Sequence, residues 1–420
     1  MLESHSALIT WVIAAIATAG VILRPWRVPE YVWALSGAAL LVVLGLLPLR
    51  AAGHAVAEGG DVYLFLLGMM VLAELARQEG LFDWLAMFAA RHAKGSATRL
   101  FDLVFLVGIV VTVFLSNDAT AVVLTPAVYA AARAAKAPPL PYLFVCAFIA
   151  NAASFVLPIS NPANLVIFGA QMPPLATWLW HFSLPSAAAI AVTYVALRLT
   201  QREQLRQPLQ TTFEPQVLGT GGRLAAVGIV LTAVTLLVAS ALGLELGLPT
   251  FCAGVASAAL IHLRLRRNPK HVLKHLSWGV LPLVAGLFVL VEGVAHTGVI
   301  GQLGQALQAL ASHSPQQASW AAGLGIGLAS NLMNNLPAGL IAASLGQTAT
   351  LPLQTTSALL IGVDLGPNLS ITGSLATLLW LVAVRREGLH VSALEFLRLG
   401  VLVMPPALLA ALAALALTAA

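Results

Sequence analysis

The sequence predicts an all-α polytopic membrane protein with two inverted repeats, about 10 transmembrane helices, two re-entrant hairpins and helices that break at mid-membrane. Of its 420 residues, 59% are hydrophobic and only 9% are charged, and the mean hydropathy is +0.91. A soluble domain carries about 25% charged residues, so this chain lacks the polar surface that a soluble fold of its length needs. Apolar segments of membrane-spanning length recur along the chain, and polar clusters interrupt each half twice.

Composition and motifs exclude several classes of function. The net charge of +5 and the isoelectric point of 9.6 do not indicate a nucleic-acid partner, because the basic residues fall in short loops between apolar spans. Cys146 and Cys252 lie in separate apolar segments and suggest neither a disulfide framework nor a metal site. The sequence contains no phosphate-binding loop and no zinc-protease, dithiol or nucleophile-elbow motif. It therefore predicts no cofactor, no metal and no enzymatic activity.

Apolar segments define spans and two longer hairpins. The N-terminus lacks the basic stretch of a secretory signal, so the first segment is predicted to be a retained span. Residues 100–134 and 315–348 are each long enough for a complete hairpin, and the polar clusters SND (116–118) and SNLMNN (330–335) interrupt them. The predicted spans are 8–23, 31–49, 61–79, 140–172, 174–197, 223–243, 249–263, 276–298, 352–384 and 390–419.

Two of these spans are unusually long, and polar residues interrupt them as well. PISNPAN (158–164) breaks the span 140–172, and DLGPNLSITGS (364–374) breaks the span 352–384. Polar groups at mid-membrane are costly unless they line a cavity or pack inside protein.

The basic loops predict the orientation. If both hairpins are re-entrant and both broken spans cross fully, only Arg50 among the 21 basic residues falls on the side opposite to the others. The positive-inside rule then places both termini outside the cytoplasm. We expect a multi-pass protein of the inner (plasma) membrane of the cell.

The same topology predicts an inverted repeat. The first repeat is 1–198, with three spans in 1–79 and a polar-tipped hairpin, a broken span and a final span in 100–198. Residues 199–222 form a cytoplasmic linker. The second repeat is 223–420, with three spans in 223–298 and the matching hairpin, broken span and final span in 315–420. Interruptions at corresponding places of two inverted halves point to a transporter's binding site.

The hairpin tips carry an acid in one half and an amide in the other. Asn117–Asp118 aligns with Asn334–Asn335. A helix cap is an alternative role for Asn117. A carboxylate at mid-membrane costs roughly 2.5–3.5 kcal/mol, more than the ~1 kcal/mol that a cap returns, so we expect Asp118 to have a functional role.

The broken spans show the opposite exchange, because Asp364 aligns with Asn151. Proline and glycine residues break the helices there and free backbone carbonyls for a ligand. Ser160 or Thr377 alone has the alternative of bonding its own helix. The predicted substrate-binding residues are Asn117, Thr120, Ser160, Asn161, Asn164, Asn334, Asn335, Asn368, Thr372, Gly373, Ser374 and Thr377.

Two further polar pairs have structural alternatives. Glu292 and His296 lie one helical turn apart and form either a proton relay or a structural pair. Glu74 is expected to pair with Arg77.

Three segments resemble the arsenical pump membrane proteins (the ArsB family) of the ion-transporter superfamily. They are SNDATAVVLTP (116–126), SNLMNNLPAGLIAASL (330–345) and GVDLGPNLSITGSLATLLW (362–380). The resemblance runs from about residue 60 to the C-terminus. It implies export of arsenite or antimonite in exchange for protons. It also implies scaffold helices in 1–79 and 223–298, transport parts in 100–198 and 315–420, a superfamily that often forms dimers, and in some relatives a separate soluble ATPase. Family members usually carry a D-T-A-S-like sequence where this chain has NAAS at 151–154, so Asn151 replaces an expected acid.

The leading hypothesis is a proton-coupled exporter of arsenite or antimonite, with Asp118 and Asp364 as proton carriers. Arsenous acid is a small neutral solute with three hydroxyl groups, which amides and hydroxyls can bind without ion pairing. The alternatives are a sodium- or proton-coupled transporter of a small carboxylate or oxyanion, a passive channel for neutral metalloid acids, and a membrane subunit that is inert without its ATPase. A carboxylate substrate would favour a basic residue, and no break contains one.

Overall fold

The structure is a computed structural model, and it describes residues 2–169, 172–210, 217–266, 268 and 270–418. The described residues form helices and turns and no β-strand, which confirms the predicted all-α class. The predicted linker 199–222 and the predicted spans 140–172 and 390–419 each include some residues that lie outside the described ones.

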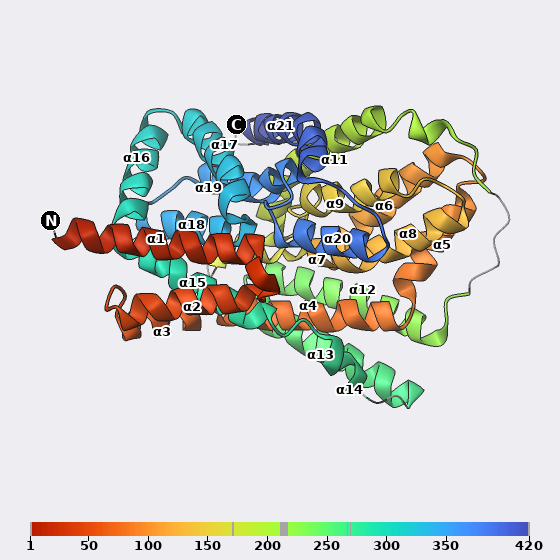
Figure 1. Ribbon diagram of the computed structural model, residues 1–420, viewed down its shortest axis with the longest axis horizontal. Helices are drawn as coiled ribbons and strands as arrows, with labels where there is room; N and C mark the ends of the chain where they lie inside the picture. Colours follow the sequence, from red (N-terminus) through yellow and green to blue (C-terminus); the bar gives the residue numbers. More distant parts are fainter. Residues whose placement is uncertain (1, 170–171, 211–216, 267, 269, 419–420) are drawn as a thin grey trace.

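The first repeat begins with two helices and a bent pair, followed by a hairpin and a broken span (Figure 1). A π-helical turn at Thr120–Leu124 and a 3-10 turn at Pro158–Ser160 lie within the hairpin and the break. The helices are α1 (Leu2–Leu23), α2 (Glu30–Val43), α3 (Leu49–Glu58), α4 (Gly60–Gln78), α5 (Leu81–His92), α6 (Ala97–Phe114), α7 (Asn117–Ala119), α8 (Thr125–Ala134), α9 (Leu140–Ala152), α10 (Pro162–Phe168) and α11 (Leu175–Thr200).

The second repeat follows the same order. A 3-10 turn at Gly366–Leu369 lies within its broken span. The helices are α12 (Thr220–Ala241), α13 (Gly247–Leu265), α14 (Lys270–His275), α15 (Val280–His296), α16 (Val299–His313), α17 (Pro315–Met333), α18 (Asn335–Thr348), α19 (Leu353–Leu365), α20 (Leu375–Arg386) and α21 (Ala393–Thr418).

Equivalent helices of the two repeats make equivalent contacts. The first two helices of each repeat pack together, α1 on α2 and α12 on α13. Across the repeats, α2 packs on α15 and α13 packs on α4. In both pairs the second helix of one repeat contacts the fourth helix of the other. The last helices, α11 and α21, pack on each other. This pattern is that of a two-fold repeat, as the order of polar interruptions predicts.

Six described helices are long and apolar enough to cross a membrane, and the bent pairs α3–α4 and α15–α16 raise this number to eight. Two shorter apolar helices, α2 and α9, add to them. The predicted span 31–49 is too long, because α2 ends at Val43 and Gly45 follows with a φ of 68°, the left-handed conformation that terminates helices. The next helix, α3, begins at Leu49, directly after Pro48.

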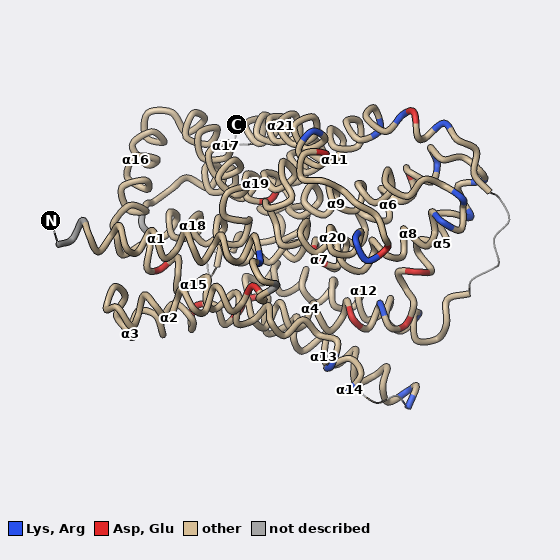
Figure 2. The backbone as a smooth tube through the Cα atoms, viewed as in Figure 1, with Lys and Arg blue, Asp and Glu red and all other residues tan. Residues whose placement is uncertain are grey.

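The two hairpins enter from opposite ends of the molecule. In Figure 1 the arms α6 and α8 lie in the right half and the arms α17 and α18 in the left half, with their tips toward the middle. Lys and Arg gather at the right-hand end in Figure 2, near the ends of α5, α11, α14 and α20. That this end faces the cytoplasm stays a prediction of the positive-inside rule.

Glycines allow close helix packing beside the second broken span. Gly323 and Gly327 on α17 face Gly362 on α19 and Gly366 in the 3-10 turn that follows α19, and a Cβ atom on Gly362 or Gly366 would collide with a carbonyl oxygen of α17. Small residues spaced four apart let membrane helices approach in this way. The hairpin arm is therefore held directly against the helix that carries Asp364.

Glycines also set the crossing of α4 and α13 in the scaffold. A Cβ atom on Gly68 would lie 2.5 Å from the carbonyl oxygen of Thr250, and one on Gly254 would lie 2.8 Å from the carbonyl oxygen of Gly68. Backbone atoms cannot rotate away as side chains do, so the two helices must separate to admit a methyl group.

We expect Gly68→Ala to destabilise the protein by about 1–3 kcal/mol, the usual cost of overpacking. Thermal unfolding in detergent micelles measures this. Gly325→Ala is the matched control, because Gly325 faces open space in α17 and alanine favours the helix. Equal midpoints for Gly68→Ala and the wild type would contradict the close crossing.

Candidate functional site

Prolines and side-chain caps shape the two breaks. Pro158 and Pro162 flank the first break, where Asn161 caps α10 because its Oδ1 accepts a hydrogen bond from the N–H of Ala163 at 3.1 Å. In the second break Ser374 caps α20, with its Oγ accepting from the N–H of Thr377 at 3.0 Å. The two breaks thus leave short half-helices whose first turns point into the middle of the protein.

Asp364 lies in the last turn of α19 and is 1% exposed. Its Oδ2 lies 2.6 Å from Oγ of Ser154, and its Oδ1 accepts a hydrogen bond from Nδ2 of Asn161 at 2.7 Å. Both partners belong to the first repeat. No described residue forms an ion pair with this carboxyl group. The acid of one broken span is therefore held by polar groups of the other.

Asn151 makes the matching contacts in the opposite direction. Its Nδ2 donates to Oδ1 of Asn368 at 3.0 Å and lies 3.4 Å from Oγ1 of Thr377. Asn368 is oriented by its own Nδ2, which donates to the carbonyl of Phe148 at 3.0 Å. The amide oxygen of Asn151 is buried and has no hydrogen-bond partner in the described structure. We call Asn151, Ser154, Asn161, Asp364, Asn368 and Thr377 the central network.

Ser160 and Asn164 bond to backbone groups at the first break. Oγ of Ser160 accepts from the N–H of Leu157 and donates to the carbonyl of Val113 on the hairpin arm α6. Nδ2 of Asn164 donates to the carbonyl of Ser154 at 2.9 Å and reaches two further carbonyls at 3.3 Å. Asn164 thus satisfies carbonyls that the break releases, and Ser160 satisfies a carbonyl of the hairpin arm.

The tip of the first hairpin is capped by Ser116, whose Oγ accepts from the N–H of Ala119 at 3.2 Å. Oδ1 of Asn117 accepts from the N–H of Asp118 at 2.9 Å, and Thr120 bonds to Thr112 at 2.8 Å. Asp118 is partly exposed, and its carboxyl group has no hydrogen bond or ion pair within the described residues. The structure does not bring Asp118 into the central network.

The tip of the second hairpin is strained. Asn334 has φ 78° and ψ 157°, a region that is almost restricted to glycine and costs about 1–3 kcal/mol for other residues. Its side chain caps α18 weakly, with a 3.4 Å contact to the N–H of Leu336, and lies 3.5 Å from the carbonyl of Thr372. Asn335 is buried, and its side chain forms no hydrogen bond with another described residue.

Asn331 joins this hairpin to the second break, and the sequence analysis missed it. Its Nδ2 donates to the carbonyls of Gly327 at 2.9 Å and Gly366 at 3.0 Å, and its Oδ1 accepts from Ser370 at 2.8 Å. Gly373 leaves room for it, since a Cβ there would lie 2.8 Å from Oδ1 of Asn331. Asn331 lies in the polar cluster SNLMNN and Ser154 lies in NAAS. Membership of these clusters was the only sequence signal that could have identified either residue as part of the site.

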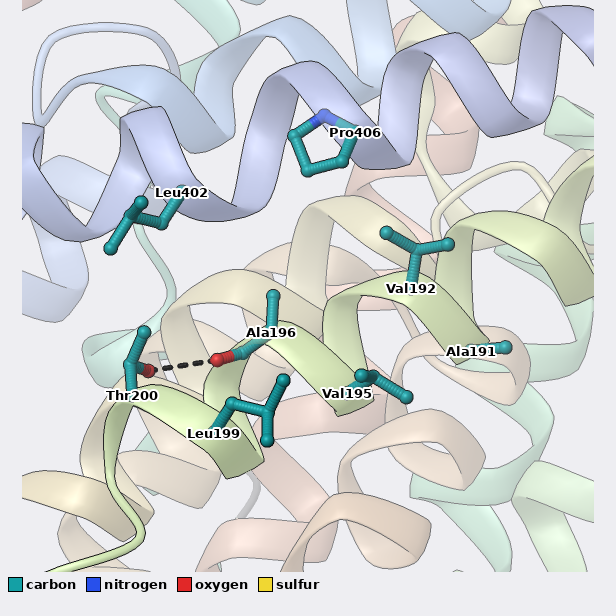
Figure 3. Close-up of a pocket in the computed structure, with 8 residues that line it drawn as sticks. All are labelled: Ala191, Val192, Val195, Ala196, Leu199, Thr200, Leu402 and Pro406. Atoms are coloured by element: carbon teal, nitrogen blue, oxygen red, sulfur yellow. Dashed lines mark hydrogen bonds between the residues drawn. The ribbon is translucent and has the colours of Figure 1, made fainter.

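Two hollows lie away from the central network. A cavity of about 240 Å³ separates α10 and α18 from scaffold residues that include Glu58, Asp61, Glu245 and Glu292. A larger apolar groove of about 520 Å³ runs between α11 and α21 (Figure 3). Thr200 contributes no free hydroxyl to it, because its Oγ1 donates to the carbonyl of Ala196 at 2.9 Å.

The two further polar pairs are present. Arg77 contacts both carboxylate oxygens of Glu74, at 2.6 and 2.7 Å. Nδ1 of His296 lies 3.2 Å from Oε1 of Glu292, and the same nitrogen lies 3.1 Å from the carbonyl of Glu292. The first pair therefore forms as expected.

Comparison with known proteins gives the family of the chain. A family model described as "Citrate transporter" matches residues 9–363. The arsenical pump membrane protein of Escherichia coli K12 is 30% identical over 379 residues, which cover 84% of this chain and 85% of that protein. The chain belongs to the arsenical pump membrane protein family. Its counterpart in Yersinia enterocolitica is 29% identical over 370 residues, with the same coverage.

Solved structures support the fold of this arsenical pump family member. The YdaH transporter of Alcanivorax borkumensis has a TM-score of 0.55 at 15% identity, covering 88% of this chain and 87% of that one. MtrF of Neisseria gonorrhoeae has a TM-score of 0.52 at 14% identity, covering 87% and 83%. The chain is thus a multi-pass transporter of the ion-transporter superfamily and not an enzyme.

We expect Asn331→Ala to destabilise the protein by about 1–3 kcal/mol, because it removes the side-chain donor to the buried carbonyl of Gly366. Asn335→Ala is the matched control at the start of α18 and removes no hydrogen bond to a described residue. Thermal unfolding of the two purified variants compares them. A loss in Asn335→Ala as large as that in Asn331→Ala would contradict the role given to Asn331.

Proposed function

We propose that this protein is a secondary active efflux transporter that exports arsenite or antimonite in exchange for protons. The observation that carries the proposal is the central network, in which a single buried acid, Asp364, is surrounded by amides and hydroxyls of both halves. Such groups can exchange hydrogen bonds with a small neutral hydroxylated solute. The relatives named arsenical pump membrane proteins support the choice of solute.

Asp364 and Asp118 are the proposed proton carriers. No basic residue pairs with Asp364 in the described structure. The charge of the site therefore changes when Asp364 binds or loses a proton, because no neighbouring cation neutralises the carboxylate. Asp118 is partly exposed at the hairpin tip and free to exchange protons with water that enters from the hairpin's side. Export follows if solute and protons occupy the site alternately.

The proposed path passes between the hairpins and the scaffold. The cavity bordered by α10 and α18 on one side and by α3, α4 and α15 on the other lies at this boundary. A relative movement of the transport parts against the scaffold would open it toward one face of the membrane.

The second candidate is a sodium- or proton-coupled transporter of a small carboxylate or oxyanion. The family model described as "Citrate transporter" favours it. The central network argues against it, since none of its residues is basic and a carboxylate would enter beside Asp364 without a counter-charge.

We expect purified protein in proteoliposomes to accumulate arsenite when the lumen is made acidic, without nucleotide and without an ATPase. Accumulation should collapse when a protonophore is added. Flux that ignores the pH gradient would contradict proton exchange and favour a passive channel. Sodium-driven uptake of citrate in the same vesicles would favour the second candidate instead.

Replacing either proposed carrier should abolish pH-driven accumulation while leaving the chain folded. We expect Asp364→Asn and Asp118→Asn each to lose accumulation but to retain arsenite exchange between equal concentrations, which needs no net proton movement. Asp83→Asn is the control, because this acid is exposed on α5 and lies outside the network. Full pH-driven accumulation in both variants would rule out these carriers.

A further inference from the structure

Ser154, in the turn that follows α9, lies between two oxygen atoms from different halves. Its Oγ is 2.6 Å from Oδ2 of Asp364 and 2.7 Å from the main-chain carbonyl oxygen of Asn151. Ser154 is fully buried. A hydroxyl group carries one hydrogen and donates one hydrogen bond. If Asp364 is ionised, both neighbouring oxygens are acceptors, and one of these short contacts has no hydrogen between its two oxygens.

The surrounding donors cannot relieve this conflict. Nδ2 of Asn161 is already directed at the other oxygen of Asp364, and the amide cannot be reversed because its Oδ1 accepts from the N–H of Ala163. Nδ2 of Asn164 is directed at backbone carbonyls of the break. The hydroxyl of Ser154 is therefore the only described side-chain donor at Oδ2 of Asp364.

No charged group opposes Asp364 from the helices packed around it. The helices α9, α10, α17 and α18 contain no Asp, Glu, Lys, Arg or His. The helices α11 and α21 also contact α19, and their ionisable residues are His181, Tyr194 and Arg198 on α11 and Glu395 and Arg398 on α21. None of these five bonds to Asp364. A buried carboxylate without a counter-charge is strongly unfavourable.

We propose that Asp364 is protonated in this conformation and that Ser154 is the positioning residue that transmits its protonation state to the first half. A protonated Oδ2 donates to Oγ of Ser154, and Ser154 donates to the carbonyl of Asn151. Every hydrogen then has one acceptor, and both short distances are hydrogen bonds. The inference rests on the proposed role of Asp364 as a proton carrier. It adds Ser154 as the residue whose hydrogen bonds change when Asp364 gains or loses its proton.

Loss of the proton changes the other end of this chain of hydrogen bonds. Only the O–H bond of Asp364 breaks, and the proton passes to water. The Ser154 hydroxyl then turns toward the carboxylate, since a hydrogen bond to an ionised group is the stronger one. The carbonyl of Asn151 then keeps backbone N–H contacts alone, from Ala153 and, at 3.3 Å, from Ser154. This loosens the last turn of α9, whose Asn151 side chain holds Asn368 in the second break.

Infrared spectroscopy of the full-length protein in lipid, at neutral pH and without substrate, tests the proposal. We expect the C=O stretching band of a protonated carboxylic acid that Asp364→Asn removes. Ser154→Ala should move that band to higher frequency, because the acid loses its acceptor, and Ser154→Thr should restore the position. Isotope labelling of aspartate carboxyl groups in the wild type assigns the band to an aspartate even if a variant fails to fold, and Asp118→Asn should leave the band of Asp364 in place.

The proposal is overturned if the labelled wild type shows only ionised aspartate at neutral pH, or if Ser154→Ala leaves the band of Asp364 in place. Neither result depends on arsenite. A protein that shows the band but transports no arsenite would contradict the proposed function alone, and a transporter without the band would contradict this inference alone.

Discussion

The structure depends on hydrogen bonds that each broken span makes to the other. Within a membrane, backbone groups that a break releases must find partners inside the protein. Here the partners come largely from polar side chains at the breaks, and the two ends, Asp364 and Asn151, each reach the opposite half. Close glycine packing of α17 on α19 and the side chain of Asn331 then attach the second hairpin to the same centre. The same hydrogen bonds therefore form the site and stabilise the two breaks.

The same contacts set the chemistry. The central network contains one acid and otherwise neutral donors and acceptors, so its charge is decided by one proton. Asn151 fits this arrangement because its Nδ2 donates to Oδ1 of Asn368, which is held in place by the carbonyl of Phe148. An ionised acid at position 151 would face that oxygen without a hydrogen to offer. The amide of Asn151 can therefore make this hydrogen bond to the neutral side chain of Asn368, which an ionised acid could not make.

Much of this arrangement could be predicted from the sequence. The polar interruptions gave the repeat order, the hairpins and the exchange of acid and amide between Asp364 and Asn151, because each is a local departure from an apolar background. The partners could not be predicted in this way. Asn161 and Asp364 are 203 positions apart, and only the folded chain shows that they meet. Asn331 and Ser154 looked like neighbours of stronger candidates, and Asn164 proved to bond to its own break.

A double-mutant cycle on Asn151 and Asn368 tests the central claim most directly. The free energy of unfolding would be measured for Asn151→Ala, Asn368→Ala and the double variant. If the two broken spans hold each other through this contact, the single effects are non-additive, with a coupling of about 0.5–3 kcal/mol. Additive effects would contradict the account, because they would mean that the contact between Asn151 and Asn368 does not hold the two breaks together.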